Sequence, residues 1–190
     1  MNYFRFKAAS SDEEIVYGSE RPGYPNESVG FNLIMDWIQF MKNREINRVC
    51  CLLTKDQLDY YNEDLLRIYR QEFGDNNLCW APVEDFHLSD LHTLTGKILP
   101  FLTDSEAQKE PVVVHCAGGM GRTGHVLAAW LVHGQQYEVE QALSEVTAMD
   151  RNPYEAVEEG TATIEQLREL LVACSPIGGN DIAEISKESE

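Results

Sequence analysis

The feature that most constrains the fold is a segment in which an apolar strand passes through a glycine-rich turn into a helix. It reads VVVHCAGGMGRTGHVLAAWLV and covers residues 112–132. The β-branched residues before His115 predict a buried strand. Three glycines in the turn allow its backbone N–H groups to converge: Gly118, Gly119 and Gly121. We therefore expect a central strand whose carboxyl end opens into a tight loop and then a helix.

Strand-like and helix-like segments alternate along the rest of the chain. Short apolar runs predict strands over residues 16–25, 48–53, 78–83 and 111–115, the first passing into a turn-rich loop. Apolar residues at helical spacing predict further helices over 27–42, 55–73, 90–107, 138–149 and 161–173. The first of these has five apolar side chains on one face: Val29, Leu33, Trp37, Phe40 and Met41. We expect Pro100 to kink or break the helix over 90–107. This alternation predicts an α/β fold with a central, mostly parallel sheet flanked by helices.

The length and composition predict one globular domain. The chain has 190 residues, of which 43% are hydrophobic, enough for a single core. We expect a domain over residues 1–174 and a polar, disordered tail over 175–190. No run approaches the ~18 apolar residues that span a bilayer, and the first residues do not resemble a signal peptide. The sequence therefore favours a cytoplasmic protein.

The charge of the chain argues against two kinds of partner. The formal net charge is -17, from 32 acidic and 15 basic residues. Nucleic acids and anionic membrane surfaces both bind basic proteins, so we expect neither as a partner. To bind an anion, such an acidic protein would need a local positive charge that overcomes the repulsion from its own acidic residues.

The cysteine pattern predicts neither a disulfide framework nor a metal site. Five cysteines are present, and no two have the C-x-x-C spacing. Three of them lie in apolar runs and are expected to be buried thiols: Cys50, Cys51 and Cys79. We expect no metal and no cofactor.

Cys116 has different neighbours, because it opens the glycine-rich loop. Converging amides, the positive end of the following helix and the planar guanidinium of Arg122 together form an anion-binding cradle. The field that holds a phosphate there also stabilises a thiolate, which places a nucleophile beneath a bound phosphoryl group. The hydroxyl of Thr123 can donate to that thiolate. The alternative is a core thiol beside an ordinary turn. The lysine of a Walker loop is absent, and only two of the three glycines of a dinucleotide-binding loop are in register.

The string HCAGGMGRTG resembles the HCxxGxxR[ST]G signature of the protein tyrosine phosphatase superfamily, in particular its small atypical dual-specificity members. The resemblance covers about residues 15–173. It implies a phosphotyrosine protein phosphatase-like fold, a phosphocysteine intermediate and no metal. Cys116, Arg122 and Thr123 would then be catalytic. The phosphate would bind to the whole loop: Ala117, Gly118, Gly119, Met120, Gly121 and Arg122.

The same resemblance implies a general acid on a loop after an earlier strand. Asp85, in PVEDF, occupies this place 31 residues before Cys116. Glu84 stands where the family has proline, so Glu84 and Asp90 are alternative acids, and a turn or helix-capping aspartate is a further interpretation of Asp85. This order, acid before cysteine, excludes the low-molecular-weight phosphatases, which have the reverse order.

Several other residues are weaker candidates. His115 would orient the loop or be a core histidine, His87 would lie near the rim of the pocket, and Arg21 would face the pocket. The segment RNPYEAVEEG, residues 151–160, resembles a loop that flanks the active site. Arg151 or Glu155 would there place substrate or water, or form a surface salt bridge.

The loop also predicts the class of substrate. Its five inner residues carry no charge, which disfavours a highly phosphorylated ligand. We expect a phosphoprotein or a small phosphomonoester as substrate. The alternatives are a phosphatase of a phosphometabolite or inositol phosphate, and a weakly active phospho-binding module.

Overall fold

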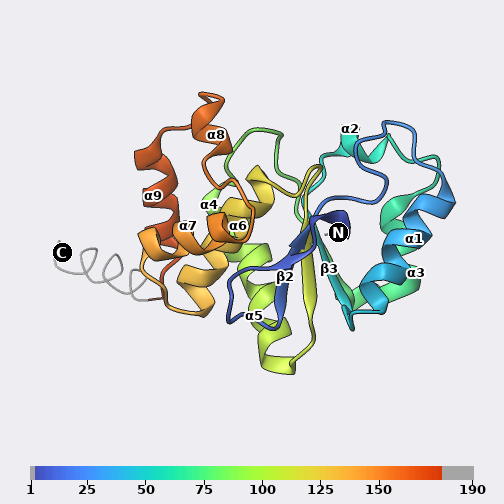
Figure 1. Ribbon diagram of the computed structural model, residues 1–190, viewed down its shortest axis with the longest axis horizontal. Coiled ribbons are helices and arrows are strands. Elements are labelled where there is room, and N and C mark those ends of the chain that lie inside the picture. The colour runs from blue at the N-terminus through green and yellow to red at the C-terminus, as the bar shows by residue number, and fades with distance from the viewer. Residues whose placement is uncertain (1–2, 177–190) are drawn as a thin grey trace, which may run out of the picture.

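The fold is a five-stranded sheet between two layers of helices (Figure 1). The computed structural model describes residues 3–176, so residues 177–190 of the expected tail lie outside the described part. The strand order is β1 (Lys7–Ala8), β2 (Val16–Ser19), β5 (Val112–His115), β3 (Arg48–Cys51) and β4 (Leu78–Trp80). Only β1 runs antiparallel to its neighbour, and the other pairings are parallel. The predicted α/β fold with a mostly parallel sheet is confirmed.

The two faces of the sheet are covered by different helices (Figure 1). On one face lie α1 (Phe31–Lys42) and α3 (Leu65–Phe73). On the other lie α5 (Leu99–Gln108), α6 (Gly121–Gly134), α7 (Val139–Ala148) and α9 (Ile164–Ala173). The central strand β5 contributes to both cores, because Val113 packs on the first face and Val112 and Val114 on the second. This alternation follows from the pleat of a strand.

Helix α1 connects the first core to the loop that follows β2. It buries Ile34, Trp37, Ile38 and Met41, while Leu33, expected on the apolar face, is 41% exposed. The indole N–H of Trp37 donates to the carbonyl of Glu20 at 3.0 Å. The helix therefore fixes the start of a loop that passes next to Cys116.

The single helix expected over residues 55–73 is in fact two. α2 (Lys55–Leu58) ends early, and α3 starts after Asp64, whose side chain accepts from the N–H of Arg67. Between them the backbone pairs with Val29: its N–H donates to Tyr60 at 2.9 Å, and its carbonyl accepts from Asn62 at 3.1 Å. These bonds replace the intrahelical bonds that one continuous helix would make.

The helix expected over 90–107 does not break at Pro100, but it changes to a π-helical turn directly before it. α4 (Leu91–Thr93) continues through a π-helical turn, η3 (Leu94–Ile98), into α5, and Pro100 lies in the first turn of α5. Proline lacks the N–H and crowds the carbonyl four residues earlier. The wider π-helical turn before it accommodates both effects, because its hydrogen bonds run from residue i to i+5.

Two short elements were not predicted. β1 has only two residues, too few for a sequence pattern. α8 (Glu155–Glu158) lies inside the segment expected to be a loop. Cys50 and Cys51 are buried, as predicted, whereas Cys79 is partly exposed.

The packing of α6 on the sheet generates a stability prediction. Leu127 is fully buried on α6, so Leu127→Ala removes apolar contacts and leaves a cavity. We expect the free energy of unfolding, measured by urea titration, to fall by about 2–5 kcal/mol. Val172→Ala, at a side chain that is 55% exposed on α9, is the control and should change it by less than about 0.5 kcal/mol. An equal effect of the two variants would contradict the packing described.

Candidate active site

The loop after β5 is the centre of the site. β5 ends at His115, residues 116–120 turn, and α6 begins at Gly121. Gly119 has φ of +70°, and a Cβ there would lie 2.6 Å from the carbonyl oxygen of Ser19. Only glycine fits both the left-handed conformation and this close approach to β2.

Arg151 holds the loop from behind. Its side chain is 3% exposed and donates to the carbonyls of Gly119 at 2.5 Å, Gly18 at 2.7 Å and Arg5 at 2.7 Å. Burial lowers its pKa to about 10, an effect that the nearby Cys116 opposes. Both interpretations of Arg151 from the sequence were wrong: it neither lines the cavity nor forms a surface salt bridge, but supports the loop.

Cys116 lies at the base of a cavity of about 140 Å³ and is 3% exposed. Four further residues of the loop and the start of α6 line the cavity: Ala117, Gly118, Met120 and Gly121. The walls come from elements far apart in the sequence: Tyr24, Asp85, Phe86, Arg122 and Glu155. Gly119 and Thr123, also predicted site residues, do not line the cavity. The buried hydroxyl of Thr123 has no hydrogen-bond partner within residues 3–176.

Arg122 brings three segments together over the cavity. Its guanidinium is 2% exposed and forms an ion pair with Asp85 at 2.8 Å. It also donates to Gln57 Oε1 at 2.8 Å and to the carbonyl of Val83 at 3.0 Å. Gln57 in turn donates to Asp85 at 3.2 Å. Cysteine, arginine and aspartate, predicted from separate segments, therefore meet in one place.

The alternative acids lie elsewhere. Asp90 is the N-cap of α4 and accepts from the hydroxyl of Thr93 at 2.7 Å and from its N–H at 2.8 Å, and both bonds lower the pKa of Asp90. Glu84 is exposed and does not line the cavity. His87 is also exposed and donates to the carbonyl of Asp85 at 2.7 Å. Asp85 is thus the carboxylate of this loop that faces Cys116.

His115 is buried behind the nucleophile position and is neutral. Its Nδ1 lies 3.2 Å from the carbonyl of Cys116 and must donate, since a carbonyl only accepts, so Nε2 accepts from the hydroxyl of Tyr69 at 3.2 Å. Burial lowers the pKa of His115 to about 4. The residue orients the loop from the core, which unites the two interpretations that the sequence left open.

Arg21, expected to face the pocket, is buried and does not line the cavity. It is 2% exposed and lies among the rings of Tyr24, Tyr60 and Tyr61, with its guanidinium carbon 5.2–5.8 Å from their centres. It donates to the carbonyls of Pro22 and Asn26. Through Tyr24 it supports the wall of the cavity without reaching it.

Sequence reasoning missed two residues of the site, Gln57 and His125. Gln57 belongs to the capping box of α2 with Thr54, a pattern that indicates a helix start rather than a site. His125 bridges two loops: its Nε2 accepts from the N–H of Ser89 at 3.0 Å, and its Nδ1 donates to the carbonyl of Gly121 at 3.2 Å. The only sequence signal for a role of His125 was its position about one helical turn after Arg122.

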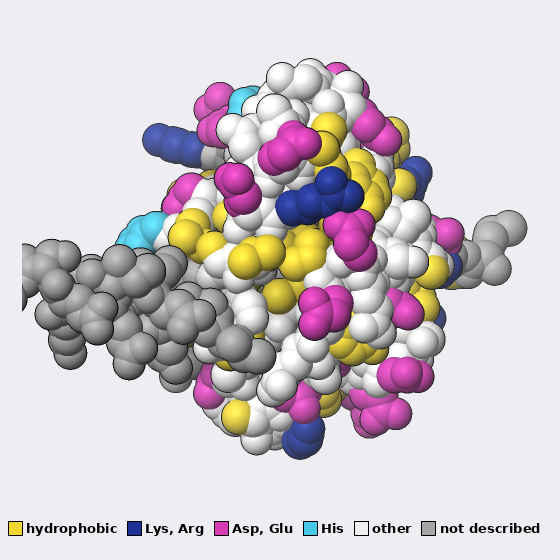
Figure 2. Space-filling model, turned by 90° about the vertical axis from the view of Figure 1, so that its left-hand side faces the viewer, with side chains coloured by type: hydrophobic (Ala, Val, Ile, Leu, Met, Phe, Trp, Pro, Cys, Tyr) yellow, Lys and Arg dark blue, Asp and Glu magenta, His cyan; other side chains and the backbone are white. Residues whose placement is uncertain are grey.

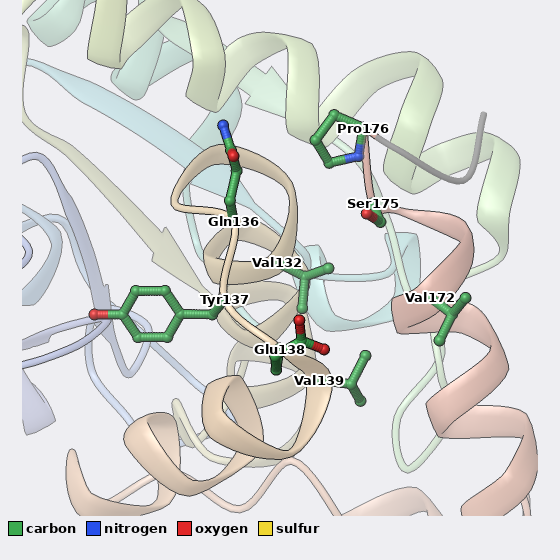
Figure 3. Close-up of a pocket in the computed structure, with 8 residues that line it drawn as sticks. All are labelled: Val132, Gln136, Tyr137, Glu138, Val139, Val172, Ser175 and Pro176. Atoms are coloured by element: carbon green, nitrogen blue, oxygen red, sulfur yellow. The ribbon is translucent and has the colours of Figure 1, made fainter. Parts of the chain in front are cut away.

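Three other cavities within residues 3–176 have neither a cysteine nor a histidine on their walls. A second cavity, of about 170 Å³, lies where α6, α7 and α9 meet, with Val132, Val139 and Val172 on its wall (Figure 3). No cysteine, histidine or arginine lines it. Residues 3–176 contain no group of three or more metal-ligating side chains. No helix in this part of the chain has the length and apolar content to cross a membrane.

A buried cysteine in a loop of converging amides, closed by an arginine and an aspartate, defines the class of cysteine-dependent phosphate-binding sites on an α/β fold. A family model described as "Dual specificity phosphatase, catalytic domain" matches residues 26–171. The chain belongs to this family.

Individual relatives are distant. The dual specificity protein phosphatase OPG106 of Vaccinia virus (strain Western Reserve) is 32% identical over 56 residues, which are 30% of this chain and 33% of the relative. The chain spans less than half the length of the curated relatives it matches. The solved structure of Tk-PTP in the active form matches with a TM-score of 0.65 at 21% sequence identity. The matched region covers 88% of this chain and 98% of the Tk-PTP chain. PTPMT1 in complex with PI(5)P has a TM-score of 0.64 at 14% identity, with 89% and 96% covered. These structures share the fold.

The buried histidines generate a pH prediction. Burial lowers the pKa of His125 to about 4, so between pH 6.5 and 4 the unfolded chain binds a proton that the folded chain does not. Stability therefore falls as the pH drops through this range. We expect the loss of unfolding free energy between pH 7 and pH 5 to be smaller in His125→Gln than in the wild type by about 2 kcal/mol. His92→Gln, at an exposed position on α4, is the control, and a slope like that of the wild type in both variants would contradict the prediction.

Proposed function

We propose that this protein is a cysteine-dependent phosphomonoester hydrolase of the protein tyrosine/dual-specificity type. The observation that carries the proposal is a cavity of about 140 Å³ that is lined by Cys116, Arg122 and Asp85, the last two joined by an ion pair. A binding module would have no use for the thiol or the carboxylate. Family membership supports the same activity.

In the first step the Cys116 thiolate attacks phosphorus. The S–P bond forms, the P–O bond breaks, and the electron pair goes to the leaving oxygen, which takes a proton from the protonated carboxyl of Asp85. Arg122 and the loop amides hold the equatorial oxygens as charge redistributes. The ion pair seen between Arg122 and Asp85 places the acid beside the group that would grip the phosphate.

In the second step water releases the phosphate. Asp85, now a carboxylate, takes a proton from the water, whose oxygen attacks phosphorus as the S–P bond breaks. The electron pair returns to Cys116 as a thiolate, to which the Thr123 hydroxyl donates. The buried hydroxyl without another partner supports this role, because a buried donor normally forms a hydrogen bond.

The proposed substrates are phosphorylated proteins or simple phosphomonoesters. The small cavity and the uncharged inner loop support this choice. A phosphoinositide or small phosphometabolite is the second candidate, favoured by the fold shared with PTPMT1, whose structure contains PI(5)P. We also propose a cytoplasmic location, because the five cysteines are free and thiols are kept reduced in the cytosol.

Cys116→Ser tests the nucleophile. We expect the kcat for p-nitrophenyl phosphate to fall by more than roughly a thousandfold, because serine is far less ionised than a thiol in the same field. Cys79→Ser, at a partly exposed cysteine of β4, is the matched control and should retain activity. Turnover that survives in Cys116→Ser would refute the mechanism.

Asp85→Asn tests the general acid through the leaving group. For phenyl phosphate, whose leaving oxygen needs a proton, kcat should fall by about 100-fold or more. For 2,4-dinitrophenyl phosphate, which leaves without protonation, the loss should be much smaller. Glu84→Gln, at the exposed neighbour, should change neither rate. If Glu84→Gln shows the leaving-group dependence instead, the acid is Glu84.

A further inference from the structure

A second carboxylate enters the proposed active site. Glu155, the first residue of α8, lines the same cavity as Cys116, Asp85 and Arg122. The two-step reaction above uses Asp85 and leaves Glu155 without a task. Its position therefore calls for a different function.

The contact between Glu155 and Gly121 shows that the loop is shaped around this side chain. Gly121 lies directly against the carboxylate, and its backbone lowers the pKa of Glu155. A Cβ on Gly121 would lie 1.9 Å from Glu155 Oε2 and 2.5 Å from its carboxyl carbon. The absence of a side chain at residue 121 thus gives the carboxylate access to the phosphate-binding loop.

The charge balance at the mouth of the cavity follows from this arrangement. Burial and the neighbouring Asp85 raise the pKa of Glu155, while Arg122 lowers it. Asp85 is paired with Arg122 at 2.8 Å, and Glu155 is a second carboxylate on the wall of the same cavity. A further anionic group on a substrate would be repelled here, and a cationic group attracted.

Two aromatic side chains also favour a cationic group on the substrate. Tyr24 and Phe86 line the cavity and remain 39% and 44% exposed. Exposed rings beside a carboxylate suit the side chain of arginine or lysine, whose apolar stem packs on a ring while its charged end reaches the carboxylate. The walls therefore offer one place for a phosphate and an adjacent place for a cation.

The face of the protein around α7 and α9 shows no concentration of charge that would provide this selection. Acidic side chains are scattered over the face formed around α7 and α9 rather than gathered at one point (Figure 2). Exposed charges further away than about 8 Å are largely screened at physiological ionic strength. The charge that distinguishes substrates must be close to the phosphate, as Glu155 is.

We propose that Glu155 is a specificity-determining residue that selects phosphopeptides with arginine or lysine beside the phosphorylated residue over those with acidic neighbours. This inference rests on the proposed phosphatase activity and adds to it the class of preferred peptide.

The test compares two phosphotyrosine peptides that differ only at the positions flanking the phosphotyrosine, which are arginine in one and glutamate in the other. The quantity measured is the ratio of kcat/KM for the basic peptide to that for the acidic one. We expect this ratio to exceed one in the wild type and to fall by about tenfold in Glu155→Gln. Glu155→Ala is the second variant and should lower the ratio in the same direction.

Glu159→Gln is the matched control, because Glu159 follows the same short helix but is exposed and does not line the cavity. It should leave the ratio unchanged. Hydrolysis of both peptides with the same ratio in Glu155→Gln as in the wild type would overturn this inference and leave the proposed function standing. If the wild type hydrolyses neither peptide nor p-nitrophenyl phosphate, the proposed function falls and this inference with it.

Discussion

The buried guanidinium of Arg122 is the interaction on which the site depends. A buried cation must be paired and hydrogen-bonded, and here the partners are Asp85, Gln57 and the carbonyl of Val83. These groups belong to the loop after β4 and to α2, so satisfying one charge determines where both segments lie. In the proposed reaction, phosphoryl oxygens would share this guanidinium with the acid, which explains why the acid stands beside the phosphate position.

Five carbonyls of residues 116–121 accept hydrogen bonds that hold the loop in place. The bonds run from His115 to Cys116, from the Arg21 N–H to Ala117, from Arg151 to Gly119, and from α6 through the Gly124 N–H to Met120 and His125 to Gly121. Two of these donors are histidines whose pKa burial lowers to about 4. They are neutral near pH 7 and support the loop without adding charge to the core. Preorganised donors of this kind stabilise developing charge without reorganising.

Local patterns in the sequence predicted the parts of the fold and site that local physics determines. The strand before Cys116, the glycine loop and the acid loop each carry their own signature, and the parallel sheet brings their ends together. Contacts between distant segments were not predictable. The pairing of Val29 with Tyr60 and Asn62 divides one expected helix, and the roles of Gln57 and His125 exist only once α2 and α6 are placed. The role of Arg151 was not predictable because its carbonyl partners, Gly119, Gly18 and Arg5, come from three segments that only the fold brings together.

The net charge of -17 and a phosphate-binding site are compatible because they act over different distances. Surface charges are screened by salt within about 8 Å, whereas Arg122 and Arg151 lie buried around Cys116, where the effective dielectric constant is low and screening is weak. A few buried cations and oriented amides therefore outweigh many exposed acids at the point where phosphate binds. Glu155 is important for a related reason: with Asp85 it is one of two acids that line the cavity of Cys116, and Asp85 is paired with Arg122.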